Sequence, residues 1–442
     1  MTYITEPSKK LKVYGNYDVV VAGAGPAGIA AAVSASKNGA KNVIIIEQTG
    51  ALGGLGTQGL VPSFISCFNG EDHVTKGIAH EVVGRLTKAN GSTGKGWPDI
   101  DAEKLKVVYD DLMEENKVKI LFFTSVSDVL TKKDKVTGIV IENKDGRQVI
   151  TGKTFVDATG DADVSFRAGV PCEKGGKKGE MQGVSVCFTA FDMDFDSFRK
   201  KCLANKKFKN LLVNAEKSGK LDYQSDSEYK FICPVKLKDG RGGFNFGHVF
   251  NIDGTKTEDL TYAMIRGRKI AHNFMAFANK YVPGMKKAKL SAVAPMVGVR
   301  ETRRIKGEYK LVVDDYTNAR HFKDNIAVFA YPIDVHVTNK STGDLKRFYK
   351  EWERMRLPPG KTCGIPFRSL LPVNFSNLIV PGRALSSDRL VQGSARVMPI
   401  CFSMGEAAGT AAAIAKKDKV DVKKVNIARL QAQLVKQGAR IF

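Results

Sequence analysis

The sequence lacks paired cysteines and any long apolar segment. Its seven cysteines contain no CxxC spacing, so they indicate neither a zinc site nor a dithiol redox motif. Residues 1–16 have no apolar signal core, and an odd cysteine count without a secretory leader is typical of reduced thiols in the cytosol. The apolar stretch at 19–33 is too short and too rich in glycine to cross a bilayer. We therefore expect a cytoplasmic protein with no metal site and no membrane span.

Charge of one sign is not concentrated anywhere, although the chain is strongly basic. Among 442 residues, 69 Lys and Arg outnumber 46 Asp and Glu, which gives a formal net charge of +23. The lysines are scattered or paired and form no basic tail. Such a field favours anionic ligands such as phosphates, carboxylates or nucleic acid, while a lysine-rich solvated surface is the plainer interpretation. The globular composition excludes a disordered or fibrous chain, and the length allows about two or three domains.

The most informative motif lies near the N-terminus. A run of valines at 19–21 predicts a buried parallel strand, and a GxGxxG pattern follows it directly. In this pattern Gly23 makes the tight turn, Gly25 lets the backbone approach a pyrophosphate, and Gly28 lets a helix pack close to the strand. The spacing predicts a dinucleotide site, and a glycine loop in an ordinary α/β turn is the alternative.

The residues after the glycines refine this prediction. Unpaired N–H groups at the helix start, around Pro26, would face the phosphates. Glu47 follows about twenty residues later, where a carboxylate accepts both hydroxyls of an adenosine ribose. A bare ribose suits NAD and the adenosine half of FAD equally, and the acid disfavours the 2′-phosphate of NADP.

Periodicity outlines the rest of the chain. An amphipathic helix is expected at 102–115 and a second helix near 256–280. The other predicted elements are strands at 118–123, 136–142 and 148–156, with a hairpin turn at 144–146 joining the last two, and a buried strand that enters a glycine turn at 377–382. A small-residue helix around 405–410 would permit close packing against a sheet or a cofactor.

Three separated blocks resemble the FAD-dependent oxidoreductases among the glutathione-reductase-type and fumarate-reductase-like flavoproteins. They are GAGPAG at 23–28 with Glu47, VDATGDAD at 156–163, and the pair of segments at 364–372 and 377–413. PMVGVRETRRIKG at 295–307 and YPIDVH at 331–336 add to the similarity, which extends from about residue 17 to 415. The resemblance implies an α/β fold, with a Rossmann-like FAD/NAD(P)-binding domain in three layers (β/β/α) and an inserted α+β substrate domain.

The nucleotide domain is predicted to be discontinuous. We expect its first part at 1–170, the inserted substrate or cap domain at 171–345, and its second part at 346–442. The polar, glycine-rich stretch at 171–180 marks the first boundary, and the buried strand and small-residue helix near the C-terminus mark the return.

Noncovalent FAD is the cofactor that the resemblance implies. An arginine at 383 would neutralise phosphate charge, and backbone N–H groups at the start of the C-terminal small-residue helix would hold the flavin N1 and O2. A loop or core role is the alternative for each cofactor residue. These residues are Gly23, Ala24, Gly25, Pro26, Ala27, Gly28, Glu47, Gln48, Gly53, Gly54, Leu55, Thr57, Val126, Ala158, Thr159, Gly160, Asp161, Gly382, Arg383, Gly393, Ser394, Arg396, Val397 and Met398.

Few residues are candidates for the chemistry itself. His336 is the first choice for a proton donor or acceptor facing the flavin, with a structural histidine as the alternative. Arg300 would bind a substrate carboxylate or phosphate, or form an ion pair with Glu301 or Asp334. Tyr331 would donate a phenolic hydrogen bond, or belong to the core. Cys67 is expected to be a buried, inert thiol.

Several more specific activities are excluded by missing motifs. The two tryptophans lie far apart, so the WxWxIP-type segment of flavin halogenases is absent. Lys361 and Thr362 resemble the end of a P-loop, but Met355 stands where that motif needs Gly. A pyridine-nucleotide-disulfide reductase would need a second GxGxxG and a cysteine pair, and the sequence has neither.

The reaction that we predict is hydride transfer between flavin N5 and a small-molecule substrate, and an anionic substrate is one option. A tRNA-modifying flavoprotein and a non-catalytic flavin-binding protein are the alternatives. Nucleic-acid binding is disfavoured because only about thirty residues follow the small-residue helix, too few for a further domain. The substrate, the electron acceptor and the oligomeric state, including a homo-oligomer, stay open.

Overall fold

The computed structural model describes Ile4, Thr338 and residues 7–65, 68–202, 205–222, 234–245, 247–336 and 355–442. The prediction for Cys67 lies outside the described residues.

A seven-stranded sheet organises the nucleotide-binding part of the chain, with strand order β3-β2-β1-β6-β5-β4 and β17 beside β6. The strands β1, β2, β3 and β17 run parallel to their neighbours, whereas β4, β5 and β6 form an antiparallel meander. The bounds are β1 Lys12–Ala22, β2 Val43–Ile46, β3 Lys119–Leu121, β4 Ser125–Lys132, β5 Lys135–Asn143, β6 Gly146–Asp157 and β17 Leu378–Ile379. The Rossmann-like α/β class predicted from the sequence is confirmed, and so are the hairpin and the late parallel strand.

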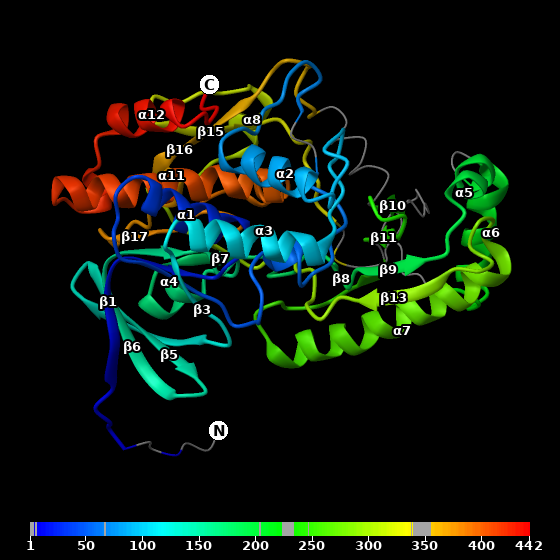
Figure 1. Cartoon of the computed structure of the whole chain (residues 1–442), viewed down its shortest axis with the longest axis horizontal. Coiled ribbons are helices and arrows are strands. Elements are labelled where there is room, and N and C mark those ends of the chain that lie inside the picture. The colour runs from blue at the N-terminus through cyan, green and yellow to red at the C-terminus, as the bar shows by residue number, and fades with distance from the viewer. Residues whose placement is uncertain are drawn as a thin grey trace.

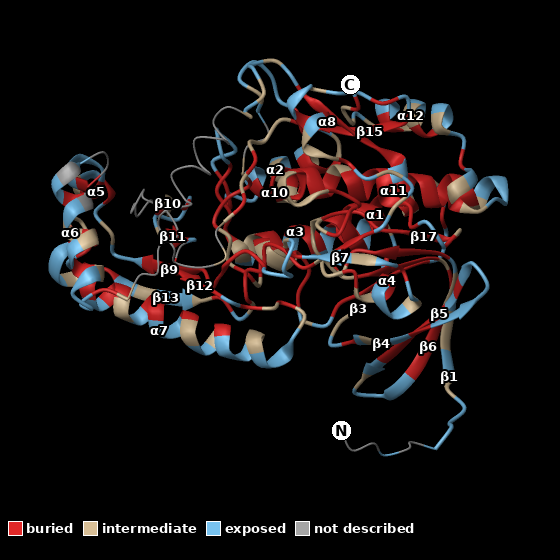
Figure 2. Cartoon of the chain, turned by 180° about the vertical axis from the view of Figure 1, so that it is seen from behind, coloured by how far each residue is buried: buried red, intermediate tan, exposed pale blue. Residues whose placement is uncertain are grey.

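The valine run of β1 is buried on both faces, which is why it does not alternate with polar residues. Val19 and Val21 pack into the cluster that contains the helices, whereas Val20 and Ala22 pack into the cluster formed with the meander. The meander therefore forms the second β layer, and the helices form the α layer, as the β/β/α prediction requires. Figure 2 shows the resulting continuous buried interior.

Helices α1 (Pro26–Lys37) and α11 (Met398–Asp418) lie side by side on the sheet. A Cβ on Gly405 would overlap the carbonyl of Ala27, and a Cβ on Gly409 would overlap the carbonyl of Ala31. These two contacts, each four residues apart on both helices, show that the helices run parallel. Their N-termini consequently lie at the same edge of the sheet.

The other helices of the main body are not all on the face of α1 and α11, because Asp163–Ala168 packs against β4 and β6. They are α2 Ile78–Lys88, α3 Ala102–Glu115, α4 Asp163–Ala168, α8 Val313–Thr317, α10 Arg389–Ala395 and α12 Ile427–Lys436. The helix predicted at 102–115 matches α3, which begins after Asp101, whose carboxylate accepts from the N–H groups of Glu103 and Lys104. No single described helix is long and apolar enough to span a membrane; α10 and α11 pass that test only together, with a bend of 91° between them.

A separate four-stranded sheet, ordered β10-β11-β9-β13, forms a lobe at one end of the molecule (Figure 1). Its aromatic core includes Phe188 and Phe244, whose rings stack with centroids 4.7 Å apart, and Phe274 of α7. The bounds are β9 Phe188–Phe191, β10 Val235–Lys236, β11 Gly242–Phe244, β13 Lys289–Val293, α5 Phe195–Cys202, α6 Lys206–Lys217 and α7 Thr257–Tyr281. The long helix predicted near 256–280 is confirmed as α7.

Three short strand pairs of the described residues lie outside these two sheets. They are β7 Cys172–Lys174 with β14 Arg303–Ile305, β8 Val184–Ser185 with β12 His248–Val249, and β15 Asn325–Phe329 with β16 Cys363–Pro366. The domain division at 170 and 345 stays a prediction. From Leu311 onward, however, the chain packs in the main core, which is earlier than residue 345. Buried residues between Leu311 and Val335 belong to the same cluster as α1 and α11.

Candidate functional site

A cavity of about 600 Å³ opens at the carboxyl edge of the parallel strands. The turns after β1, β2, β6 and β17 line it together with the start of α11. The lobe contributes the opposite wall with Leu260, Met264, Met296, Val297 and Val299. This edge is where open α/β sheets bind ligands, because several strand ends and helix N-termini meet there.

Most of the predicted cofactor residues line this cavity. They come from four separated parts of the sequence and are Gly23, Ala24, Gly25, Pro26, Ala27, Glu47, Gln48, Gly54, Leu55, Val126, Ala158, Thr159, Gly160, Asp161, Gly382, Arg383, Arg396 and Met398.

A smaller group of predicted residues lies behind the wall and shapes it. Thr57 donates its hydroxyl hydrogen to the carbonyl of Leu52 at 2.6 Å, which fixes the glycine loop, and Val397 precedes the first turn of α11. Ser394 donates to the carbonyl of Tyr331. This group consists of Gly28, Gly53, Thr57, Gly393, Ser394 and Val397.

Other residues that line the cavity were not predicted from the sequence. Thr124 and Ser125 directly precede Val126, so the strand-end pattern could have extended to them. The lobe residues and Cys401 follow no local motif. Burial raises the pKa of the Cys401 thiol to about 12, which keeps it protonated. The unpredicted lining residues are Ile46, Thr124, Ser125, Asp163, Arg167, Gly254, Leu260, Met264, Met296, Val297, Val299, Pro381 and Cys401.

The three glycines of the first motif have three different environments. Gly23 has a φ of 90°, which favours glycine, and a Cβ there would meet the carbonyl of Ala158. A Cβ on Gly28 would overlap the Gly23 carbonyl, so only glycine lets α1 approach the strand this closely. A Cβ on Gly25 would meet nothing within 4 Å and would instead project into open space at the cavity wall. Gly25 therefore leaves backbone accessible to a ligand.

The carboxylate of Glu47 is fixed at the end of β2. It accepts hydrogen bonds from the N–H of Ala24 at 2.9 Å, the N–H of Thr49 at 2.9 Å and the hydroxyl of Thr49 at 2.9 Å. A carboxylate has about four acceptor positions, so a position stays available toward the cavity. This geometry suits a ribose hydroxyl.

Positive charge is gathered along the cavity. Arg383 donates from Nη2 to Asp161 at 2.7 Å, while its buried Nη1 has no partner among the described residues. Arg396 donates from Nη2 to the carbonyl of Asp334 at 2.9 Å, and its buried Nε is likewise unpartnered within the described part of the chain. The N-termini of α1 and α11 add their positive dipole ends. Buried unsatisfied donors are costly, so these groups indicate an anionic ligand.

Behind Arg396 lies a polar cluster around Asp334. His336 Nε2 lies 3.2 Å from Asp334 Oδ1, and His336 Nδ1 lies 3.0 Å from His248 Nε2. Tyr331 donates its hydroxyl to Asp334 Oδ2 at 3.1 Å. Burial alone would raise the pKa of Asp334, but the charges of His336 and Arg396 hold it well below its usual range. Asp334 is therefore ionised and orients the histidine beside it.

The predicted candidates thus come together, and a further histidine joins them. His336 and Tyr331 both contact Asp334, which lies between them in the same segment. His248 arrives from β12 in the lobe, 88 positions away, and no local pattern marks it. Burial and the nearby carboxylate raise the pKa of Tyr331, which keeps its hydroxyl protonated.

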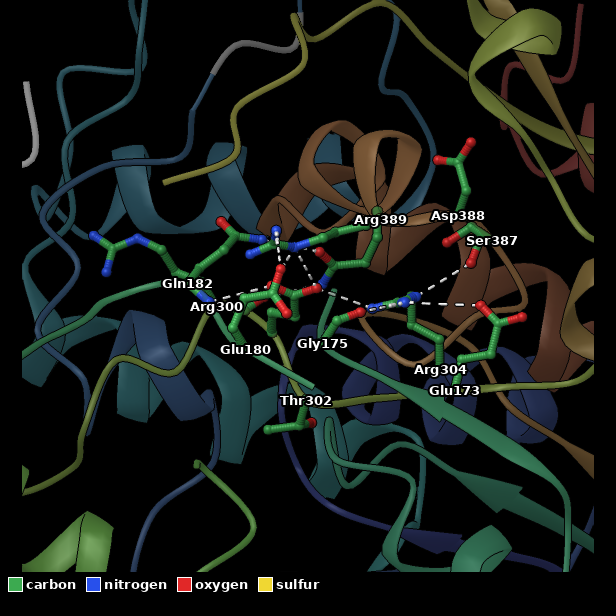
Figure 3. A network of polar contacts seen from close by, with 12 residues as sticks. Glu173, Gly175, Glu180, Gln182, Arg300, Thr302, Arg304, Ser387, Asp388 and Arg389 are labelled. Carbon is green, nitrogen blue, oxygen red and sulfur yellow. Dashed lines mark hydrogen bonds and ion pairs between the residues drawn. The ribbon is translucent and has the colours of Figure 1, made fainter. Parts of the chain in front are cut away.

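A buried ion-pair network supports this cluster (Figure 3). Glu301 accepts from Arg304 Nη1 at 3.0 Å and from Arg389 Nε at 3.0 Å, and it also receives the N–H of Gln182. Gln182 in turn accepts from the backbone N–H of His336 at 2.9 Å. The network therefore links the β14 and α10 regions to the histidine.

Arg300 is directed into the protein framework. Its Nη1 donates to the carbonyl of Gly183 at 2.8 Å and its Nη2 to the hydroxyl of Ser185 at 3.1 Å. Neither contact involves Glu301 or Asp334, the ion-pair partners considered from the sequence. Its proposed role toward a substrate stays a prediction.

Comparison with known proteins matches residues 18–434 to a family described as FAD dependent oxidoreductase. The chain belongs to this family. FAD is accordingly its cofactor, and the cavity residues fit it: an accessible glycine backbone, an anchored carboxylate and arginine donors that no described residue satisfies suit a diphosphate-linked adenosine.

Two curated proteins and a solved structure are similar to this chain. A soluble pyridine nucleotide transhydrogenase from Chromohalobacter salexigens is 33% identical over 34% of this chain and 33% of its own length. A tRNA uridine 5-carboxymethylaminomethyl modification enzyme from Campylobacter fetus is 26% identical over 42% of this chain and 31% of its own length. The chain thus spans about a third of each. The crystal structure of p-nitrophenol 4-monooxygenase from Pseudomonas putida is similar with a TM-score of 0.47 and 10% identity, over 92% of this chain and 82% of that one.

Proposed function

We propose that this oxidoreductase transfers a hydride between a small-molecule substrate and the flavin, and that His336 and His248 exchange the accompanying proton. The supporting observation is a series of contacts that starts at the cavity. Arg396 lines the cavity and donates to the backbone carbonyl of Asp334, the carboxylate of Asp334 contacts His336, and His336 contacts His248. FAD supplies the hydride-transferring centre when bound.

The contacts suggest how the two histidines share a proton. With Asp334 ionised, the Nε2–H of His336 donates to it, and Nδ1 then accepts from the Nε2–H of His248. A proton arriving at this pair is stabilised by the negative charge of Asp334. An imidazole pair is suited to this task because histidine titrates near neutral pH.

The cavity walls suggest which substrates fit. The lobe side is mostly apolar, with Leu260, Met264, Met296 and Val297, whereas the arginines lie on the side of α11. We propose a small substrate with an apolar body and an anionic group. Modification of tRNA is the less favoured alternative, because its only support is the name of one relative among those compared above.

Anaerobic reduction tests the proposal. The protein is loaded with FAD, mixed with candidate substrates and with NADH or NADPH, and flavin absorbance is followed by stopped flow. His336→Asn should lower the reduction rate by roughly 10²- to 10⁴-fold while FAD stays bound. His272→Asn, on the exposed face of α7, is the matched control and should reduce at the parental rate. An unchanged rate for His336→Asn would remove it from proton transfer.

A further inference from the structure

A second cavity of about 610 Å³ lies away from the cofactor site, among α1, α2, α11 and α12. These four helices lie together in Figure 1, with α2 and α12 beside the α1–α11 pair. Ser34 and Asn38 line it from α1, Glu406 from α11, and Gln433 and Gln437 from α12. The cofactor cavity contains none of these residues.

The floor of this cavity has polar groups whose hydrogen-bonding capacity the described residues do not fill. Ser34 is 1% exposed, and its hydroxyl has no hydrogen-bond partner among the described residues. Glu406 is also 1% exposed. Its carboxylate accepts from the N–H of Ile78 at 3.1 Å and from Gln437 Nε2 at 2.9 Å. About two acceptor positions remain on the carboxylate.

Among the residues that the structure describes, no cationic side chain contacts the Glu406 carboxylate directly. Burial raises the pKa of Glu406 to about 7, and the nearby charge of Lys37 only partly opposes this. Lys37 instead pairs with Glu81 at 2.7 Å on the rim. A buried charge without a counterion is costly, so a ligand that carries a positive charge would relieve that cost.

The rim of the cavity is exposed and basic, unlike the buried floor. Lys76, His73 and His80 are exposed and line the mouth. Lys76 makes no hydrogen bond or ion pair with the described residues, whereas Asp72 on the same rim pairs with Arg440 at 2.6 Å. The cavity therefore offers an acceptor at its floor and an uncommitted cation at its mouth.

We propose that this second cavity binds a small zwitterion, an amino-acid-like molecule whose ammonium contacts Glu406 and Ser34 and whose carboxylate contacts Lys76. The ammonium supplies three donors, which match the open positions of the carboxylate and the serine hydroxyl. The carboxylate end stays near solvent, where the rim lysine meets it. This site is independent of the proposed hydride transfer.

Binding should be coupled to a proton. The charged and titratable groups that line the cavity with Glu406 are Lys37 from α1, His80 and Glu81 from α2, and Asp72, His73 and Lys76 from the preceding loop, while the lining residues of α12 and its end are neutral. Below pH 7 the ammonium must displace the proton of Glu406, so affinity should fall by up to about tenfold per pH unit. Above pH 7 it should level off.

Calorimetric titration of the FAD-loaded 442-residue chain tests the proposal. The probes are glycine, β-alanine, γ-aminobutyrate and longer ω-amino acids, each beside the alkylamine and the alkanoate of the same chain length. At least one amino acid should bind at least about tenfold more tightly than both matched compounds. Glu406→Gln and Lys76→Gln should each weaken that binding by about tenfold or more. Glu258→Gln, on α7, is the control and should bind like the parent.

Three outcomes would overturn the proposal. The first is that no amino acid in the series exceeds its matched amine and acid. The second is that Lys76→Gln, an exposed substitution that leaves the core intact, binds like the parent protein. The third is an affinity that does not change with pH below 7. Flavin absorbance of Glu406→Gln shows whether that variant is folded.

Discussion

Replacing Gly25 by alanine separates cofactor binding from folding. The backbone there has φ −73° and ψ −177°, which alanine adopts freely. The added Cβ would meet no atom within 4 Å, because it projects toward the cofactor cavity. Gly28→Ala is the matched comparison, since its Cβ would overlap the carbonyl oxygen of Gly23.

The two variants should therefore fail in different ways. Gly25→Ala should change the free energy of unfolding of the FAD-free protein by less than about 1 kcal/mol. It should weaken FAD binding by at least about tenfold. The added methyl group keeps the diphosphate away from the backbone N–H groups, so a charge-assisted hydrogen bond between them is lost. Gly28→Ala should cost about 1–3 kcal/mol of stability through overpacking.

Urea unfolding of the FAD-free proteins and fluorescence titration with FAD measure both quantities. Parental FAD affinity in Gly25→Ala would refute the placement of the diphosphate at this turn. A stability loss in Gly25→Ala as large as that in Gly28→Ala would refute the distinction between the two glycines.

Three further changes have defined outcomes. Arg383→Gln removes a cation from the cavity whose buried Nη1 has no partner in the described part of the chain, and equilibrium dialysis should show FAD affinity lowered by roughly 10- to 100-fold. Glu301→Gln leaves Arg304 and Arg389 without their shared carboxylate, so urea unfolding should show a loss of about 3–5 kcal/mol, and a loss under 1 kcal/mol would contradict the buried network. The folded-state pKa of Glu406, about 7, exceeds its unfolded value of 4.5, so the native state retains a proton that the unfolded chain releases. Its contribution to stability should fall by about 3 kcal/mol as pH rises from 4.5 through 7, and the difference in stability between parent and Glu406→Gln should follow that trend.

The parts of the fold with strong local signals could be predicted. The valine run, the glycine motif and Glu47 follow one another along the chain, so the β1–α1–β2 unit is determined by short-range geometry. The small residues of α11 indicated close packing, which the structure shows as contact between Gly409 and Ala31. Strand ends at β6 and β17 converge on the cavity because parallel strands share a carboxyl edge.

The parts that depend on long-range contacts could not be predicted. His248 reaches His336 only because β12 pairs with β8 in the lobe, and neither two-residue strand has a recognisable periodicity. The apolar wall of the cavity consists of single side chains such as Met264 and Met296 from separate elements. The return of the chain to the main core at Leu311 has no composition change to mark it.

We expect FAD to bind in the cavity between the N-termini of α1 and α11 and to be reduced there. The most direct measurement is the visible spectrum of the purified protein, reconstituted with FAD and then titrated anaerobically with candidate substrates. The flavin absorption bands should appear and should bleach with a substrate, and Gly25→Ala should retain less FAD than the parent. A protein that stays colourless after reconstitution would contradict this expectation.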